Sequence, residues 1–337
     1  MFKNIRAAKR YIYLETYIFD NDNIGKKFKR MLLRKVQERV DIKIMVDGMG
    51  SKANKKFFLD IIENGGDVRI FKEFEWSFRL VKKNTSRDHR KLLVIDDEVS
   101  YIGSSNITSN SLTWREANLK INGDMAVLFK RAFLENFNLF DKHFFISKKY
   151  IAPLKRNGLE IIRDIPSLKF RCTRKQQIAM IRKAQNEIII EVPYFLPYFR
   201  LRKELKDARV RGVKVIIIVP KYSDIRIIDL LREKYLGKLH ESGINIMLFT
   251  PEVLHSKLMV VDEKQFMLGS SNMDNRSYSL QFEINLYGSN YYIIKMLMSH
   301  FRQTLAECEP FDYKAWKRRT IVQKIVEKLL SIFRYSF

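Results

Sequence analysis

The sequence predicts an α/β protein made of two homologous units that face each other across a pseudo-twofold axis, with a functional site between them. Stretches with the apolar pattern of strands alternate with stretches of helical spacing, which favours sheets covered by helices. The whole pattern occurs twice, in copies of about 150 to 170 residues, well above the period of solenoid repeats. One short polar motif recurs in the same register of each copy.

The elements of the first copy follow from local patterns. The helix predicted over 24–39 carries Phe28, Leu32 and Val36 at a spacing of four, which is typical of a helix with one apolar face. Gly48 ends one predicted strand, and Gly65 ends the next predicted helix. The expected strands are 11–15, 41–47, 68–71, 91–95, 99–102 and 118–121, and the expected helices are 24–39, 57–64 and 125–143.

The second copy matches the first letter by letter in places. The stretch IRAAKRYIYLE, from residue 5, aligns with IRKAQNEIIIE, from residue 181. The expected strands of this copy are 159–162, 187–191 and 213–219, and its expected helices are 176–184 and 201–209. We expect the two units to span residues 1–150 and 151–312.

The composition is that of a folded protein with a strong basic excess. Lys and Arg number 63 against 38 Asp and Glu, which gives a formal charge of +25. Such an excess favours anionic partners, namely phospholipid headgroups, nucleic acid or phosphorylated substrates, although a lysine-rich composition alone would also produce it. The two cysteines give no disulfide framework. No run of about 18 apolar residues predicts a transmembrane helix, so we expect any membrane contact to be peripheral.

Residues 313–337 differ in character from both units. The basic run Lys317 to Arg319 precedes apolar residues that recur every four positions, namely Ile321, Ile325, Leu329 and Phe333. This spacing predicts a basic amphipathic helix. Such a helix suits an anionic membrane surface, and docking on the core of the protein is the alternative.

Each copy contains H-x-K-x4-D, followed by G-S-S-N and then by a glutamate. The first set is His89, Lys91, Asp96, Gly103 to Asn106 and Glu116, and the second is His255, Lys257, Asp262, Gly269 to Asn272 and Glu283. The aspartate and the first glycine stand at 96 and 103 in one copy and at 262 and 269 in the other. One such motif is short and carries little weight, but two in matched register indicate a single site built from two halves.

These residue types suit phosphoryl chemistry. One histidine can attack phosphorus and later leave, while the second donates a proton to the departing alkoxide and then accepts one from the acceptor. Lys91, Lys257, Asn106 and Asn272 would surround the phosphate oxygens and stabilise the developing charge, so that neither a metal nor a cofactor is expected. No G-x4-G-K-[ST] loop exists, which leaves nucleotide hydrolysis without support.

The remaining motif residues have supporting roles in this interpretation. Glu116 and Glu283 could each bind Nδ1 of a histidine and fix its tautomer, leaving Nε2 for the reaction. The small residues around Ser104 and Ser270 would let the backbone approach the phosphate. Each motif aspartate follows an apolar strand at a turn, where holding the loop is a better fit than direct catalysis.

At these residues the chain resembles the phospholipase D superfamily, whose hallmark is a duplicated H-x-K-x4-D with a following G-[SG]-x-N. Within that superfamily it looks most like the bacterial cardiolipin synthases, and the likeness spans nearly all of the 337 residues. The segments that carry this closer resemblance include Tyr17 to Phe19, Asp47 to Ser51, Trp114 to Glu116, Pro193 to Pro197, Asn272 to Ser277 and Phe282 to Asn285.

The resemblance implies two α-β-α sandwich units of the phospholipase D fold and phosphatidyl transfer between lipids, typically two phosphatidylglycerols giving cardiolipin and glycerol. One motif histidine would carry a covalent phosphatidyl intermediate. We assign His89 as the nucleophile and His255 as the acid and base, an assignment that the internal symmetry leaves open. The implied catalytic set is His89, Lys91, Asp96, His255, Lys257 and Asp262, supported by Ser104, Asn106, Glu116, Ser270, Asn272 and Glu283.

Three other functions stay open at this point. They are hydrolysis of phospholipid to phosphatidic acid, cleavage of nucleic acid, and non-enzymatic binding by a relic site. The complete paired set of motif residues argues against a relic, and the internal duplication with N-M-D-N-R-S favours lipid over nucleic acid. We expect phospholipids and an anionic membrane surface as partners, at the cytoplasmic face of the bacterial inner membrane. The sequence leaves the oligomeric state open.

Overall fold

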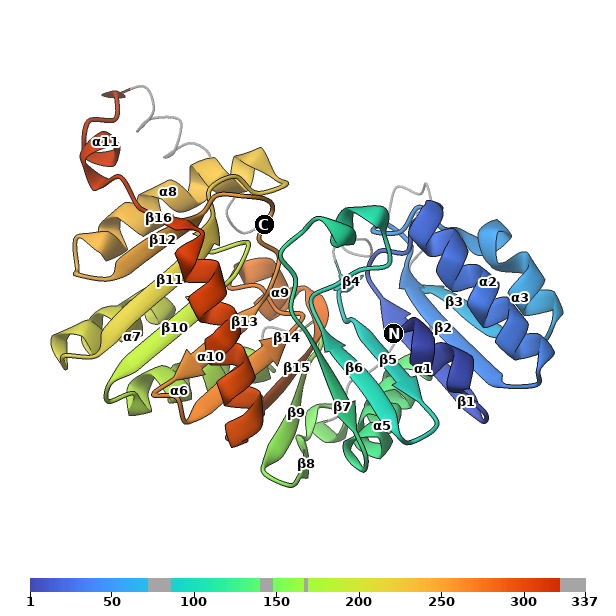
Figure 1. Cartoon of the computed structure of the whole chain (residues 1–337). Coiled ribbons are helices and arrows are strands. Elements are labelled where there is room, and N and C mark those ends of the chain that lie inside the picture. The colour runs from blue at the N-terminus through green and yellow to red at the C-terminus, as the bar shows by residue number, and fades with distance from the viewer. Residues whose placement is uncertain (72–85, 140–147, 167–168, 322–337) are drawn as a thin grey trace.

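Two α/β units lie side by side in the computed structural model, which describes residues 1–71, 86–139, 148–166 and 169–321 (Figure 1). Each unit has its own mixed sheet, and the six strands of the first sheet recur in the same order in the second. The predicted class, α/β with two homologous units, is confirmed.

The first sheet has the strand order β3-β2-β1-β5-β6-β7. Its strands are β1 (Tyr11–Thr16), β2 (Asp41–Asp47), β3 (Asp67–Phe71), β5 (Leu92–Ile95), β6 (Val99–Gly103) and β7 (Asn118–Asn122). β1, β2 and β3 are parallel, whereas β5, β6 and β7 run antiparallel to their neighbours. The parallel strands are joined by helical crossovers, and the antiparallel ones follow one another through short turns.

Helices cover both faces of this sheet. The outer face is covered by α1 (Phe2–Ala7), α2 (Asn23–Gln37) and α3 (Leu59–Glu63), the last preceded by a 3-10 turn at Lys55–Phe58. Ile12 and Leu14 of β1 pack into this outer core, while Tyr11 and Tyr13 point to the inner face. The alternation explains why β1 is buried along its whole length.

The second sheet repeats the order as β12-β11-β10-β13-β14-β15. Its strands are β10 (Glu187–Glu191), β11 (Lys214–Pro220), β12 (Asn245–Phe249), β13 (Leu258–Val261), β14 (Gln265–Gly269) and β15 (Gln281–Gly288). Three further strands extend its two edges, namely β8 (Leu154–Arg156), β9 (Leu159–Asp164) and β16 (Cys308–Pro310). Helices α6 (Cys172–Lys183), α7 (Phe199–Val210) and α8 (Arg226–His240) lie on its outer side.

One apolar cluster joins the units from within. It contains inner-face residues of both sheets together with α5 (Met125–Phe137) and α10 (Tyr291–Ala306). Phe129 and Phe133 on α5 and Phe301 on α10 are fully buried in it. The two repeats therefore share a core, and burial of this interior stabilises their relative placement.

Local patterns predicted all six strands of the first sheet, but only β9, β10 and β11 of the second. β2 and β10 occur with the predicted bounds, and α5 ends at Phe137, earlier than the predicted helix to 143. Helices α8 and α10 were not predicted. Residues 140–147 and most of the predicted C-terminal helix, 322–337, lie outside the described residues; within the described part, a short helix α11 occupies Tyr313–Lys317.

Candidate active site

His89 of the first unit is fixed to the sheet of the second. It follows β4 (Arg87–Asp88), which pairs in parallel with β15. The backbone N–H of His89 donates to the carbonyl of Phe282 at 3.0 Å. From the other side, Oδ2 of the buried Asp47 accepts a hydrogen bond from the backbone N–H of Asp88 at 3.0 Å. The histidine is thus held by both units.

His255 of the second unit is fixed to the first in the same way. Its backbone N–H donates to the carbonyl of Arg115 at 2.8 Å, and Arg115 N–H donates to the carbonyl of Val253 at 2.9 Å. Phe282 and Arg115 each precede a motif glutamate in the sequence. The two attachments are therefore equivalent under the internal symmetry.

Each histidine side chain is paired with the glutamate of the opposite unit. Nδ1 of His89 lies 3.0 Å from Oε1 and 3.2 Å from Oε2 of Glu283. Nδ1 of His255 lies 3.0 Å from Oε1 of Glu116. A carboxylate in this position keeps the proton on Nδ1 and leaves Nε2 as the reactive nitrogen. The predicted histidine–glutamate pairing exists, and it crosses between the units.

The motif serines connect the glutamate segments to the two sheets. Ser270 Oγ donates to Glu283 and accepts from Ile284 N–H at 3.0 Å. In the first unit, Ser104 Oγ accepts from Ala117 N–H at the same distance. These contacts fix the backbone directly after each glutamate.

Gly103 and Gly269 are required by close packing at this point. A Cβ on Gly103 would lie 2.2 Å from the carbonyl oxygen of Ala117, and one on Gly269 would lie 2.3 Å from that of Ile284. Both obstacles are backbone atoms, so they cannot move aside as a flexible side chain would. The small residues of G-S-S-N therefore let each glutamate strand approach its neighbour.

The two motif lysines are buried in the centre of the site. Nζ of Lys91 donates to the carbonyl of His89 at 2.7 Å, and Nζ of Lys257 to that of His255 at 2.5 Å. Burial lowers the pKa of Lys91 to about 7, with the charge of Lys257 adding to the effect. Burial lowers the pKa of Lys257 to about 8. The charge of Lys257 acts on Lys91, and the crossed histidine–glutamate contacts join the same two motifs in one cluster.

The two histidine–glutamate pairs differ in their electrostatics. Burial, reinforced by Lys91 and Lys257, holds the pKa of His89 well below its ordinary value. Burial raises the pKa of Glu283 to about 7. Burial would also raise the pKa of Glu116, but its contacts with His255 outweigh this and lower it to about 2. His255 thus faces a carboxylate that is firmly ionised, whereas His89 faces one that ionises near neutrality.

Asn106 and Asn272 are buried beside this cluster. Asn106 Oδ1 accepts from the backbone N–H of Ile18 at 3.2 Å, which orients its carboxamide. Asn272 is 3% exposed, and its Oδ1 has no hydrogen-bond partner among the described residues. A buried acceptor of this kind is costly unless a donor completes it, whereas the predicted role at the phosphate belongs to the Nδ2 donor of the same side chain.

The comparisons with known proteins agree with this geometry. The family model described as "Cardiolipin synthase, PLD-like domain" matches residues 1–139 and 177–305. The cardiolipin synthase of Geobacillus sp. (strain WCH70) is 30% identical over 342 residues, covering 98% of this chain and 68% of that protein. The chain belongs to the cardiolipin synthase family of phospholipase D-like proteins.

Other relatives and one solved structure extend the comparison. The major cardiolipin synthase ClsA of Bacillus subtilis is 29% identical, over 98% of this chain and 72% of its own length. Phosphatidylserine synthase from Haemophilus influenzae superposes with a TM-score of 0.79 at 15% identity, covering 100% of this chain and 92% of its own. That likeness confirms the fold predicted for this family.

Asp96 and Asp262, which belong to the predicted catalytic set, bind backbone groups at the other end of their strands from the motif lysines. The carboxylate of Asp96 accepts from the backbone N–H groups of Lys9, Arg10 and Tyr11 at 2.6 to 2.9 Å. That of Asp262 accepts from three consecutive N–H groups, at residues 185–187, at 2.7 to 2.9 Å. Both residues follow β5 or β13 at the end away from the lysine, with φ of 57° and 54°. Asp96 therefore holds the turn before β1, and Asp262 the turn before β10, as their places in the sequence suggested.

Two aromatic rings beside the histidines were not assigned a role from the sequence. The ring of Tyr17 lies 4.9 Å from that of His89, edge to face, and the ring of Trp114 lies 5.0 Å from that of His255. Tyr17 follows β1, and Trp114 stands two residues before Glu116. In the sequence, their positions next to the motif segments could have indicated that both rings lie at the site.

A second layer of buried polar groups lies under each motif. In the first unit, Asn136 Nδ2 donates to Glu15 at 2.5 Å, and Glu15 and Asp88 form a pair whose pKa values burial raises. In the second, Nε2 of His300 lies 2.7 Å from Oε1 of Glu191. His300 of α10 thus lies against a carboxylate that is fully buried.

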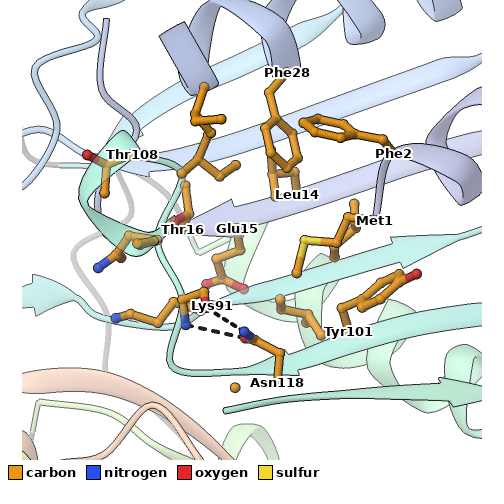
Figure 2. A pocket seen from close by; sticks show the side chains of 18 of the residues that line it. Met1, Phe2, Leu14, Glu15, Thr16, Phe28, Lys91, Tyr101, Thr108 and Asn118 are labelled. Carbon is orange, nitrogen blue, oxygen red and sulfur yellow. Dashed lines mark hydrogen bonds between the residues drawn. The ribbon is translucent and has the colours of Figure 1, made fainter. Parts of the chain in front are cut away.

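A cavity of about 300 Å³ adjoins the first motif. Figure 2 shows Lys91 and Glu15 on one side of it and the apolar side chains of Leu14 and Phe28 on the other. Asn106 is also part of its lining. Apolar space therefore lies next to the buried lysine of the site.

Proposed function

We propose that this protein transfers a phosphatidyl group between phospholipids, converting two phosphatidylglycerols into cardiolipin and glycerol. The observation that carries the proposal is the pair of histidine–glutamate contacts that cross between the units. They supply two oriented imidazoles in one buried site, which a two-step transfer through a covalent intermediate requires. Membership of the cardiolipin synthase family supports the choice of substrates.

In the first step, Nε2 of His89 attacks phosphorus of one phosphatidylglycerol. The bond from phosphorus to the glycerol oxygen breaks, and protonated His255 gives its Nε2 proton to that oxygen. Glycerol leaves, and the phosphatidyl group stays on His89 through a P–N bond.

In the second step, neutral His255 accepts the proton of a hydroxyl group on the second phosphatidylglycerol. The hydroxyl oxygen attacks phosphorus, the P–N bond breaks, and cardiolipin is released. His89 returns to its neutral form and His255 to its protonated form. Protons and bonds therefore balance over the cycle without any further reactant.

The electrostatic difference between the pairs supports His89 as the nucleophile. Its pKa is held well below the ordinary value, so its Nε2 lone pair is available. Burial and the charge of Lys257 lower the pKa of His255 as well, but Glu116 opposes them, so His255 is less strongly shifted than His89 and is the better proton donor of the two. Lys91, Lys257, Asn106 and Asn272 would donate to the phosphate oxygens as negative charge develops on them.

The membrane is the proposed place of action. The formal charge of +25 suits an anionic leaflet, and the apolar side of the cavity beside Lys91 suits part of a lipid. Among the helices described here, none has both the length and the apolarity needed to cross a bilayer. The proposal includes peripheral binding at the cytoplasmic face of the bacterial inner membrane. The basic C-terminal segment, residues 313–337, would provide a further contact with the membrane.

The decisive experiment separates the two histidines with a reactive substrate. A phosphatidyl ester of p-nitrophenol has a leaving group that needs no proton. His255→Ala should release one equivalent of p-nitrophenol in a burst and accumulate phosphatidyl-enzyme, visible by intact mass, whereas His89→Ala should release none. The reverse pattern would exchange the roles, and turnover in both variants would refute the two-histidine mechanism.

The wild type provides the test of the reaction itself. On phosphatidylglycerol it should form cardiolipin and glycerol in equal amounts, measured by thin-layer chromatography and a glycerol assay. Phosphatidic acid as the sole lipid product would mean hydrolysis, and cleavage of an oligonucleotide in place of lipid would mean a nuclease.

A further inference from the structure

A second, strongly basic cavity lies on the outer side of the second unit, away from the motif residues. It has a volume of about 500 Å³ and is formed by α6, α7 and the residues before each. Its walls are mostly cationic, and the basic side chains that line it include Arg171, Arg174, Lys175, Lys183 and Arg200. Ile178 and Ala179 supply an apolar part of the lining.

Positive charge in this cavity is only partly balanced. No carboxylate is among the described residues that line it. The nearest compensation is Glu204, whose Oε1 pairs with Arg182 at 2.5 Å and with Arg200 at 3.7 Å. Burial, reinforced by the charge of Arg174, lowers the pKa of Arg171. Such a concentration of like charge around one cavity favours the binding of an anion.

One inaccessible polar atom points to the same conclusion. Nε of Arg171 has no hydrogen-bond partner among the described residues. The guanidinium of Arg174 lies 3.8 Å from the ring centre of Tyr198, which holds both side chains in place at the cavity wall. A half-buried guanidinium with an unused donor, next to one that is fixed against a ring, favours the binding of an anion.

We propose that this cavity binds the phosphate of an anionic phospholipid headgroup and so attaches the second unit to the membrane. A discrete hollow of this size fits one glycerophosphate group, whereas a nucleic acid needs a longer basic track. Phe199 stands next to the cavity wall and is 73% exposed, which suits an aromatic ring that enters the interfacial region of a bilayer. The choice of a lipid over a soluble phosphate rests on the proposed function.

The cavity also contacts the active-site region through packed rings. Tyr198 lies edge to face with Tyr278 at 5.6 Å. Tyr278 belongs to α9 (Asn275–Ser279), the same short helix as Arg276, whose charge lowers the pKa of His89. The packed rings of Tyr198 and Tyr278 would therefore separate a headgroup in the cavity from the backbone of α9, the helix that borders the active site.

The test is binding to vesicles by sedimentation. The variant Arg174→Ala/Lys175→Ala/Lys183→Ala removes three cations from the cavity. The matched control Lys26→Ala/Arg30→Ala/Arg34→Ala removes three exposed cations from α2, the helix of the first unit that corresponds to α7. Each is compared with the wild type on vesicles of phosphatidylcholine alone and of phosphatidylcholine with phosphatidylglycerol. Thermal unfolding checks that all are folded.

We expect the cavity variant to lose at least about tenfold in affinity for the phosphatidylglycerol vesicles and the control to lose about twofold or less. If the triple variant is unstable, Lys175→Gln/Lys183→Gln takes its place. This variant changes only two exposed side chains and should show part of the same loss of affinity. Equal losses in the cavity variant and the control would overturn the proposal, since they would mean non-specific attraction.

Two competition arms identify the ligand. Inorganic phosphate, at the phosphate concentration of the vesicles, should not displace the protein from them. Displacement would mean a site for soluble phosphate, and a loss of oligonucleotide binding with unchanged vesicle binding would mean nucleic acid; both refute the proposal. Cardiolipin formation in detergent micelles is measured in parallel. If the wild type forms no cardiolipin there, the proposed function fails; if it does, but the cavity variant and the control bind vesicles equally, only the cavity proposal fails.

Discussion

The imidazole of His89, in the first unit, is held by the carboxylate of Glu283, in the second, with Nδ1 and Oε1 3.0 Å apart. The same two segments are joined by the hydrogen bond from His89 N–H to the carbonyl of Phe282. The reciprocal contact between His255 and Glu116 completes the symmetry. Neither unit could therefore orient its own histidine without the other.

Glu283→Gln and Glu116→Gln should each lower kcat for phosphatidyl transfer by about 10²- to 10⁴-fold, because the amide no longer fixes the reactive tautomer of the histidine. Glu187→Gln, which removes a partly exposed carboxylate paired with Lys214, is the matched control and should change kcat little. Initial rates with phosphatidylglycerol measure the effect. A loss confined to one of the two motif glutamates would contradict equal dependence on both crossed pairs.

The pH profile of kcat/KM should be bell-shaped and narrow. Glu283, with a pKa of about 7, loses its negative charge as the pH falls through that value, and activity should fall with it. Lys91 and Lys257, with pKa values of about 7 and 8, lose their positive charges as the pH rises, which weakens binding of the phosphate. The two limbs report coupled groups of the free enzyme.

Lys91→Arg tests the alkaline limb. Arginine stays protonated over this range, so the fall in kcat/KM should move to higher pH even if the maximum is lower. Lys214→Arg, at an exposed lysine on β11, should leave the profile unchanged. An alkaline limb at the same pH in Lys91→Arg would exclude Lys91 as its cause.

Asp262→Ala should destabilise the protein by about 2 to 3 kcal/mol, because three backbone N–H groups lose a charged acceptor. Activity per folded molecule should stay near that of the wild type. Urea unfolding gives the stability, and Asp207→Ala, which removes an exposed ion pair on α7, should cost at most about 0.5 kcal/mol. Loss of the chemical step with normal stability would return Asp262 to the catalytic set.

The same aspartate predicts a pH dependence of stability. Backbone hydrogen bonds outweigh burial and lower the pKa of Asp262 in the folded state. Its contribution is therefore present above the unfolded value of 3.8 and is lost as the pH falls through the lower folded value. The stability difference between wild type and Asp262→Ala should shrink in that acidic range.

Arg90→Met should destabilise the protein by about 3 to 5 kcal/mol. Arg90 is 3% exposed, its Nε donates to the carbonyl of Glu283 at 3.2 Å, and its charge lowers the pKa values of Glu15 and Asp88 against the effect of burial. Removing it leaves two buried carboxyl groups without their cation. Calorimetric unfolding measures the loss, Arg30→Met on the surface of α2 is the control, and adding Glu15→Gln to Arg90→Met should recover part of it.

The local sequence was sufficient for the strands of the first sheet and for β9 to β11 of the second. Strands such as β2 and β10 are short apolar runs bounded by polar residues, so their bounds depend on neighbours in the chain. Helix α10 was missed although it packs against β12 and β13 of the second sheet, because the partners that bury its apolar face are distant in the sequence. The basic cavity was hidden for the same reason, since α6 and α7 bring its side chains together only in the fold.

For the site, the sequence by itself showed that two histidines, two lysines and two glutamates recur in corresponding positions, because the duplication preserves the spacing of the histidines and lysines and shifts the glutamate by one position. It did not determine which glutamate serves which histidine. Glu116 is 27 positions from His89 and Glu283 is 194, yet Glu283 is the partner. The tertiary structure decided this, because β4 pairs with β15 of the other unit, and that register places the backbone of His89 beside Phe282 and its ring beside Glu283.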